Sequence, residues 1–196
     1  MGVEGWLGVV PAVALAIALA ASTGLRAWLP LLLTGIVARS GFLELGPSFQ
    51  FLASDRALVA LGLATVLEIT ADKIPVVDHV LDTLSVVIRP AAGSLLAASV
   101  LWPVADPFTA LALGTVIGAP SSLVPHAAKS ALRAASTAFT GGLANPVLSL
   151  VEDTAALALF VLAVVVPVVV TLGLVAIAVL LAKRLAHGPR PAVRTT

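Results

Sequence analysis

The feature that most restricts the fold is an uncharged apolar stretch from Thr154 to Ala182. About 20 apolar helical residues cross the hydrocarbon core of a bilayer, which is about 30 Å thick. The stretch is longer than this, so it should tilt, bend at Pro167 or extend beyond the lipid. Only 11% of the 196 residues are charged and 60% are hydrophobic, whereas a soluble domain is about 25% charged. The sequence therefore excludes a soluble enzyme and a disordered chain.

A second apolar block runs from Gly5 to Leu25 and continues beyond Arg26 to Ala38. It is too long for one straight span. The small residues Ser22-Thr23-Gly24 and the later Pro30 predict either a broken helix or two consecutive helices.

Between residues 57 and 151 the uncharged runs are shorter and are separated by charged or Pro/Gly-rich stretches. Short, interrupted apolar segments are typical of half-helices and re-entrant loops. We therefore expect an all-α, polytopic membrane protein with about five or six membrane elements, including broken or re-entrant helices.

The ends of the chain predict its organisation and orientation. Residues 1–186 should form a single transmembrane domain, and residues 187–196 a short disordered cytoplasmic tail. No acidic residue follows Asp153, and the basic residues after it are Lys183, Arg184, Arg190 and Arg194. The positive-inside tendency places this C-terminus in the cytoplasm.

An inverted repeat is one explanation for two similar patterns. Ser22-Thr23-Gly24 is followed later by Glu68, and Ser121-Ser122 by Glu152-Asp153. Transporters are often built from such repeats. The alternative is that small residues recur because membrane helices pack through them.

The first charged group is acidic and lies between Leu67 and Pro90. Its members are Glu68, Asp72, Lys73, Asp78 and Asp82, with Arg89 near its end. Glu68 and Asp72 share one helix face at i, i+4, and Asp78 and Asp82 share another. Ionisable groups inside a membrane are costly and often mark ion or proton pathways. These carboxylates are therefore candidates for binding a cation or passing protons.

The alternative for this group is an amphipathic helix at the membrane surface. Its charges would then lie among lipid headgroups and pair locally, as Glu68 with Lys73 or Asp82 with Arg89.

The second charged group is basic. His126, Lys129 and Arg133 lie at i, i+3 and i+7, on one face of a helix. Such a face suits a phosphate, a carboxylate or an anionic lipid headgroup. The alternatives are a solvated stripe and countercharges for the acidic group. Hinge-like residues at 118–122 and 140–142 should let this helix enter the membrane and return.

Three further charges complete the candidate site. Glu152 and Asp153 should begin the last helix, where they either offset its dipole or pair with Lys129, Arg133 or substrate. Arg26 lies inside an apolar block and needs a partner, because a buried unpaired guanidinium is too costly.

Several stretches resemble a known family in their residues and order: ADKIPVVDHVLDTLSVVIRPAAG, HAAKSALRAAS, TGG, LANP and LVEDT. Across residues 22–154 the chain resembles bacterial integral membrane proteins grouped as domain of unknown function four-one-two-six. The resemblance implies a location in the bacterial inner membrane and supplies no catalytic residues. A weaker likeness links Glu68-Ile-Thr-Ala-Asp72-Lys73 to the Glu-x-Gly-Asp-Lys motif of cation/proton exchangers, although one residue is added and the glycine is missing.

The leading hypothesis is a secondary transporter or channel-like protein for an ion or small anionic solute, with no cofactor and no enzymatic activity. One alternative is a flippase or binder of anionic or polyprenyl-phosphate lipids, with lipid beside Lys129 and Arg133. Another is a Mg²⁺-dependent enzyme acting on phospho-lipids through Asp78 and Asp82. The last is a structural subunit, favoured if every charge is paired and no cavity exists. Expected partners are membrane lipid and a possible second copy of the chain, but no nucleic acid.

Overall fold

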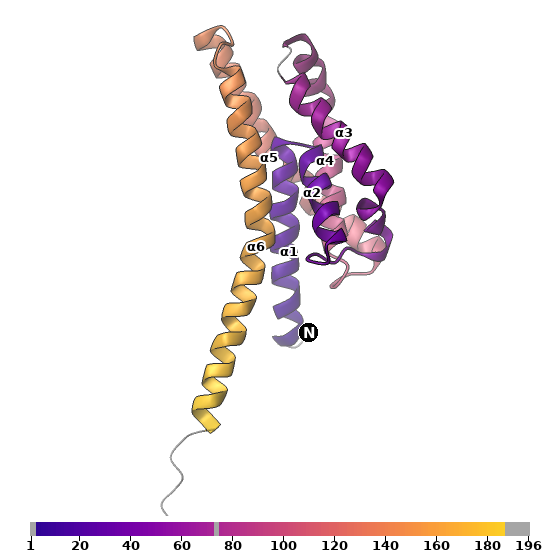
Figure 1. The fold of residues 1–196 in the computed structure, drawn as a ribbon, viewed down its shortest axis with the longest axis vertical. Coiled ribbons are helices and arrows are strands. Elements are labelled where there is room, and N and C mark those ends of the chain that lie inside the picture. Colours follow the sequence, from indigo (N-terminus) through magenta and orange to yellow (C-terminus); the bar gives the residue numbers. More distant parts are fainter. Residues whose placement is uncertain (1–2, 73–74, 187–196) are drawn as a thin grey trace, which may run out of the picture. The chain divides into compact units, whose positions relative to one another are not determined.

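All regular elements in the described part of the chain are helices, which confirms the predicted all-α class. The structure is a computed structural model that describes the backbone of residues 3–72 and 75–186, and the side chains of residues 8–72, 81, 83–166 and 183. The elements, labelled in Figure 1, are α1 (Val3–Leu25), α2 (Trp28–Arg39), the 3₁₀-helix η1 (Pro47–Ala53), α3 (Asp55–Ala71), α4 (Pro75–Val100), α5 (Pro107–Thr140) and α6 (Asn145–Ala186).

The chain divides into two units, Met1–Val164 and Val165–Thr196. The first unit contains the first five turns of α6 and all the helices before it; the second contains the rest of α6. The predicted tail, 187–196, lies outside the described residues. All the structural relationships below are within the first unit.

Four segments of the described residues are long and apolar enough to cross a membrane: Gly8–Leu25, Thr83–Val100, Pro107–Thr140 and Asn145–Val166. A shorter apolar helix, Trp28–Arg39, accompanies them. These lengths and compositions support a polytopic helical membrane protein.

The expected break after the first apolar block is present. α1 ends at Leu25, and α2 begins at Trp28. The hydroxyls of Ser22 and Thr23 bond to the carbonyls of Leu19 and Ala20 in the preceding turn. Arg26 therefore lies in a junction between two helices rather than in the middle of a span.

Small residues let α1, α4 and α5 pack closely against one another. A Cβ added to Gly24 would overlap the backbone carbonyl of Ser122, and one added to Gly118 would overlap the carbonyl of Gly93. Close backbone approach through small residues is the usual packing mode of membrane helices. The two small-residue motifs that suggested a repeat, around Gly24 and Ser122, thus meet at one helix crossing.

The prediction of a hinge at residues 118–122 was wrong. α5 is a continuous helix that includes both Pro120 and Pro125. Membrane helices tolerate proline where neighbouring helices cover the freed backbone groups, and α5 packs here against α1 and α4. The hinge predicted at 140–142 corresponds to the end of α5, where Gly141 has φ 62°.

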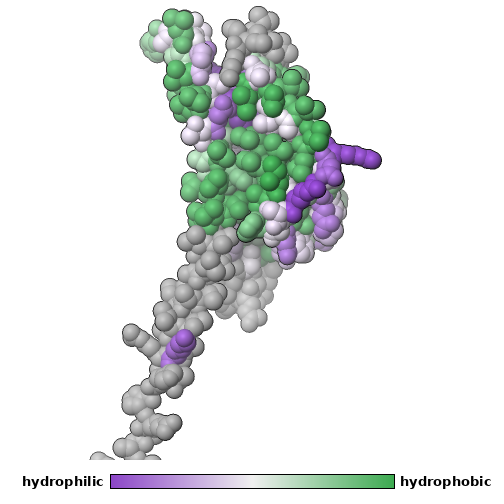
Figure 2. All heavy atoms as spheres, in the orientation of Figure 1, coloured by the Kyte–Doolittle hydropathy of each residue, from purple (hydrophilic) through white to green (hydrophobic). Residues whose placement is uncertain are grey.

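One end of the first unit carries exposed charges and aromatic rings. Arg39 at the end of α2 forms an ion pair with Asp55 at the start of α3, and both side chains are more than half exposed. Phe42 and Phe51 lie nearby in sequence and are also exposed. Figure 2 shows apolar side chains across the middle of the visible face, with hydrophilic ones gathered near η1 and the start of α3. This end has the mixed character of a membrane–water interface.

Candidate functional site

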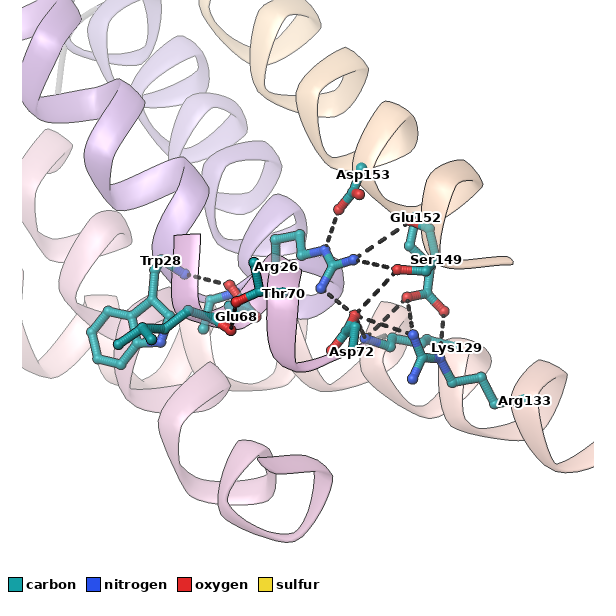
Figure 3. Close-up of polar contacts among 12 residues, drawn as sticks. Arg26, Trp28, Glu68, Thr70, Asp72, Lys129, Arg133, Ser149, Glu152 and Asp153 are labelled. Carbon is teal, nitrogen blue, oxygen red and sulfur yellow. Dashed lines mark hydrogen bonds and ion pairs between the residues drawn. The ribbon is translucent and has the colours of Figure 1, made fainter. Parts of the chain in front are cut away.

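Charged residues from four helices and one junction meet inside the first unit. Seven of their side chains are at most 9% exposed, and that of Asp153 is 26% exposed. The cationic members are Arg26, Arg89, Lys129 and Arg133, and the anionic members are Glu68, Asp72, Glu152 and Asp153. We call these eight residues the charge cluster. Its main contacts are drawn in Figure 3.

Asp72 is the residue on which most of the cations converge. It caps the C-terminal end of α3. Its Oδ2 pairs with Arg26, lies 3.1 Å from Nη2 of Arg133 and 3.8 Å from Nζ of Lys129. The hydroxyl of Ser149 is 3.5 Å from the same oxygen. One carboxylate therefore links the α1–α2 junction, α5 and α6 (Figure 3).

Glu152 neutralises the basic face of α5. Its two oxygens accept hydrogen bonds from Nε and Nη2 of Arg133, each at 3.0 Å, and Oε2 is also 3.0 Å from Nζ of Lys129. This two-pronged arrangement matches the planar guanidinium to the carboxylate. Lys129 and Arg133 were predicted to hold an anionic substrate or lipid headgroup, or to be countercharges for the acidic group. In the structure both cations form ion pairs with Glu152 and Asp72.

Arg26 has the partners that its position requires. Its guanidinium pairs with Asp72, its Nε is 2.5 Å from Oδ1 of Asp153, and its Nη2 donates to the hydroxyl of Ser149 at 2.9 Å. The residue is fully buried. A break between α1 and α2 places this cation inside the bundle, where two acidic residues from α3 and α6 compensate it.

Glu68 joins the start of α2 to α4. Its carboxylate accepts hydrogen bonds from the backbone N–H groups of Ala27 at 2.9 Å and Trp28 at 3.3 Å. These are unpaired donors at the N-terminus of α2, where a negative charge is also favoured by the helix dipole. Glu68 lies 3.5 Å from Nη2 of Arg89, and Nη1 of Arg89 donates to the carbonyl of Gly24 at 2.6 Å.

The cluster holds as many formal negative charges as positive ones. Removing a charge from water is costly, and attraction between buried partners repays this only when the geometry and hydrogen bonding are good. Each of the four cations and four carboxylates has at least one oppositely charged partner within 3.5 Å. Loss of any one member would leave an excess charge in the interior.

An open pocket of about 500 Å³ borders the charge cluster. Its walls include Leu67 of α3 and Ile88 of α4, and its polar lining includes Glu68, Asp72 and Arg89. This volume is within the range of small-molecule sites, which combine apolar walls with a few polar groups. The cluster is therefore reachable from outside the bundle on one side.

The other predicted site residues stand as follows. His126 is buried on α5 on the same face as Lys129. Lys73 lies outside the described residues, and so do the side chains of Asp78 and Asp82, although their backbone belongs to α4. Among the side chains that the structure describes, no three His, Cys, Asp or Glu residues are grouped to hold a metal ion.

The expectation that Glu152 and Asp153 begin the last helix was wrong. α6 begins at Asn145, so both residues lie about two turns inside it. Asn145 and Pro146 form the first turn of the helix, where proline is well accommodated. The carboxylates therefore do not offset the helix dipole, and they point into the charge cluster instead (Figure 3).

Sequence reasoning missed two components of the site. Ser149 donates and accepts within the cluster, and it precedes Glu152 by three residues on the same face of α6. The i, i+3 spacing between Ser149 and Glu152 could have indicated from the sequence that Ser149 belongs to the site. The N–H groups of Ala27 and Trp28 could have been found from the predicted break, since a new helix starts with unpaired donors.

A family model described as "Domain of unknown function (DUF4126)" matches residues 13–186, which is most of the chain. The chain belongs to this family. Membership in DUF4126 confirms the resemblance seen in the sequence. No curated protein and no solved structure matches the chain. The function of this DUF4126 member must therefore be argued from its own site.

Proposed function

We propose that this chain is a membrane transport protein of the bacterial inner membrane, and that the pocket beside Glu68 and Asp72 receives the molecule it moves. The observation that carries the proposal is the contact between a buried charge cluster and an open pocket. Ionisable groups at membrane depth are costly, and they usually face a cavity that serves a solute, ion or proton.

The two carboxylates are the groups best suited to couple movement to a proton or cation. A carboxylate can lose its charge by binding a proton, whereas a guanidinium stays charged. Glu68 and Asp72 both line the pocket and both contact cations behind it. Protonation of either one would leave the cluster with excess positive charge and weaken its ion pairs. Binding at the pocket would thereby alter the ion pairs that join Glu68 to α4 and Asp72 to α5.

The basic face of α5 has a supporting role in this proposal. Lys129 and Arg133 are each held by Glu152. An anion would have to displace that carboxylate before it could bind either cation. The pocket, rather than the basic face, is the entry point that the geometry favours.

A structural role is the second candidate function, because the charges of the cluster balance and are mutually paired. The open pocket argues against it. Purely structural charges are often replaceable by apolar residues without loss of stability, and such charges have no need of an open pocket beside them.

Proteoliposomes loaded with a trapped pH-sensitive dye test the proposal. Gradients of Na⁺, K⁺, Cl⁻ and phosphate would be imposed in turn, and wild-type protein should move protons or counter-ions faster than empty liposomes under at least one. The variants Glu68→Gln and Asp72→Asn should abolish that flux. Glu44→Gln is the matched control, because Glu44 is exposed and distant from the cluster in sequence. Equal flux in wild type and Glu68→Gln, or none above empty liposomes, contradicts transport coupled to these carboxylates.

A further inference from the structure

We infer that the pocket between α3 and α4 binds an aminophospholipid, whose primary ammonium and phosphate meet the charged residues of the pocket. This inference rests on the proposed function and extends it, because it names the class of molecule that the pocket receives. It follows from where the pocket opens, how deep its charges lie and which signs they carry.

The pocket opens onto an apolar surface. Leu67 is one of its lining residues and is 67% exposed. On the same helix, Leu63 and Val66 are 63% and 59% exposed. A surface of this kind on a polytopic membrane protein faces lipid rather than water. The molecule that enters the pocket should therefore come from the bilayer and have an apolar portion.

The charged lining lies below the headgroup layers of the membrane. Asp55 and Arg39 form an exposed ion pair at the first end of α3, which marks one interface. Glu68 lies thirteen residues further along α3, or at most about 20 Å along the membrane normal. Since the hydrocarbon core is about 30 Å thick, Glu68 lies at least about 10 Å from the opposite interface, so a headgroup that meets it must leave the interface, as the headgroup of a transported lipid does.

The lining carries both signs of charge. Glu68 and Asp72 are acceptors for the N–H donors of an ammonium group, and the guanidinium of Arg89 suits a phosphate. Arg89 and Glu68 pair with each other at 3.5 Å, so a zwitterion would bind by placing its phosphate and its ammonium between them. A headgroup with only a phosphate would meet two carboxylates and one cation. A trimethylated ammonium has the right charge but no N–H to donate. A primary ammonium joined to a phosphate satisfies both kinds of lining group.

Ligand titrations in detergent test this inference with short-chain lipids of identical tails. The protein would be delipidated and titrated with dioctanoyl phosphatidylethanolamine, phosphatidylcholine and phosphatidylglycerol, with binding read by thermophoresis. Phosphatidylethanolamine should bind about tenfold more tightly than the other two, a difference of roughly one well-made hydrogen bond to a charged group. The double variant Glu68→Gln/Asp72→Asn should remove this preference.

Two leucine variants separate pocket binding from general adsorption. Ser85→Leu fills the pocket from α4 and should abolish the preference, since Ser85 is a buried lining residue. Thr115→Leu adds a side chain of the same size to an exposed position of α5 and should leave binding unchanged. Circular dichroism checks that both variants keep their helical content. An undiminished preference in a folded Ser85→Leu variant overturns the assignment to this pocket.

Two further binding measurements define the class of ligand. Glycerophosphoethanolamine has the same headgroup without chains and should not compete; competition at equal concentration would mean a soluble zwitterion instead of a lipid. Equal affinity for all three lipids would mean that only the tails bind, which overturns the inference. These titrations need no ion gradient, so they are independent of the flux assay. A headgroup preference without flux would contradict the transport proposal alone. Flux without a headgroup preference would contradict the aminophospholipid inference alone.

Discussion

Arg133 on α5 holds Glu152 on α6 through two N–H···O contacts, each 3.0 Å long. The same carboxylate lies 3.0 Å from Lys129, one turn earlier on α5. Asp72 then joins both cations to Arg26. The ion pairs thus form a chain of contacts across the bundle, in which each charge has its partner on a different helix.

Glu152→Gln should lower the free energy of unfolding by about 3–5 kcal/mol, because it leaves two buried cations with a single shared carboxylate. Unfolding by SDS in mixed micelles, followed by circular dichroism, measures this change. The matched control is Asp55→Asn, which breaks an exposed ion pair of Arg39. Exposed pairs contribute at most about 1 kcal/mol, so similar losses in the two variants would mean that the cluster is hydrated.

Glu68→Ala should destabilise the protein more than Glu68→Gln. Alanine leaves the N–H groups of Ala27 and Trp28 without their acceptor, and an unsatisfied buried donor costs about 1–3 kcal/mol. Glutamine keeps an amide oxygen that can accept one of these bonds. Amide hydrogen exchange at Trp28 is the direct measurement, and it should be fastest in the alanine variant. Equal exchange in both variants would show that the carboxylate does not cap α2.

Asp106, which lies outside the membrane spans, makes the stability of the first unit depend on pH. Hydrogen bonds from Thr109, and from the backbone N–H of Phe108, lower the pKa of this exposed carboxyl. A lowered pKa in the folded state contributes stability above the ordinary pKa, and that contribution is lost as the pH falls through the folded value. The stability of Asp106→Asn should therefore decline less than that of wild type below about pH 4. Parallel pH profiles of melting temperature would contradict this role.

Much of the fold follows from patterns within short stretches of sequence. The apolar blocks predict membrane helices, and the small residues before Arg26 predict the junction that separates α1 from α2. Spacing alone also places Lys129 and Arg133 on one face of a helix. Each of these features depends on residues within a few helical turns of one another.

The partners of the charges could not be predicted in the same way. Arg26 pairs with Asp72 and Asp153, which are far from it in sequence. Any acidic residue on a neighbouring helix could have served, so local pairs such as Glu68 with Lys73 were equally good hypotheses. The choice depends on how α1, α5 and α6 pack. The continuity of α5 through Pro120 likewise depends on packing that local rules do not contain.

Gly118, at the crossing of α4 and α5, allows a last test of helix packing. Gly62 provides the control, because the same substitution there should not destabilise the protein. A Cβ at Gly118 would overlap the backbone of Gly93, so Gly118→Ala should force the helices apart and cost about 1–3 kcal/mol. A Cβ at Gly62, inside α3, would meet nothing within 4 Å. Gly62→Ala should therefore be neutral or stabilise by up to about 1 kcal/mol, since alanine favours helix. SDS unfolding of the two variants measures both effects, and a neutral Gly118→Ala would mean that the helices do not approach this closely in the membrane.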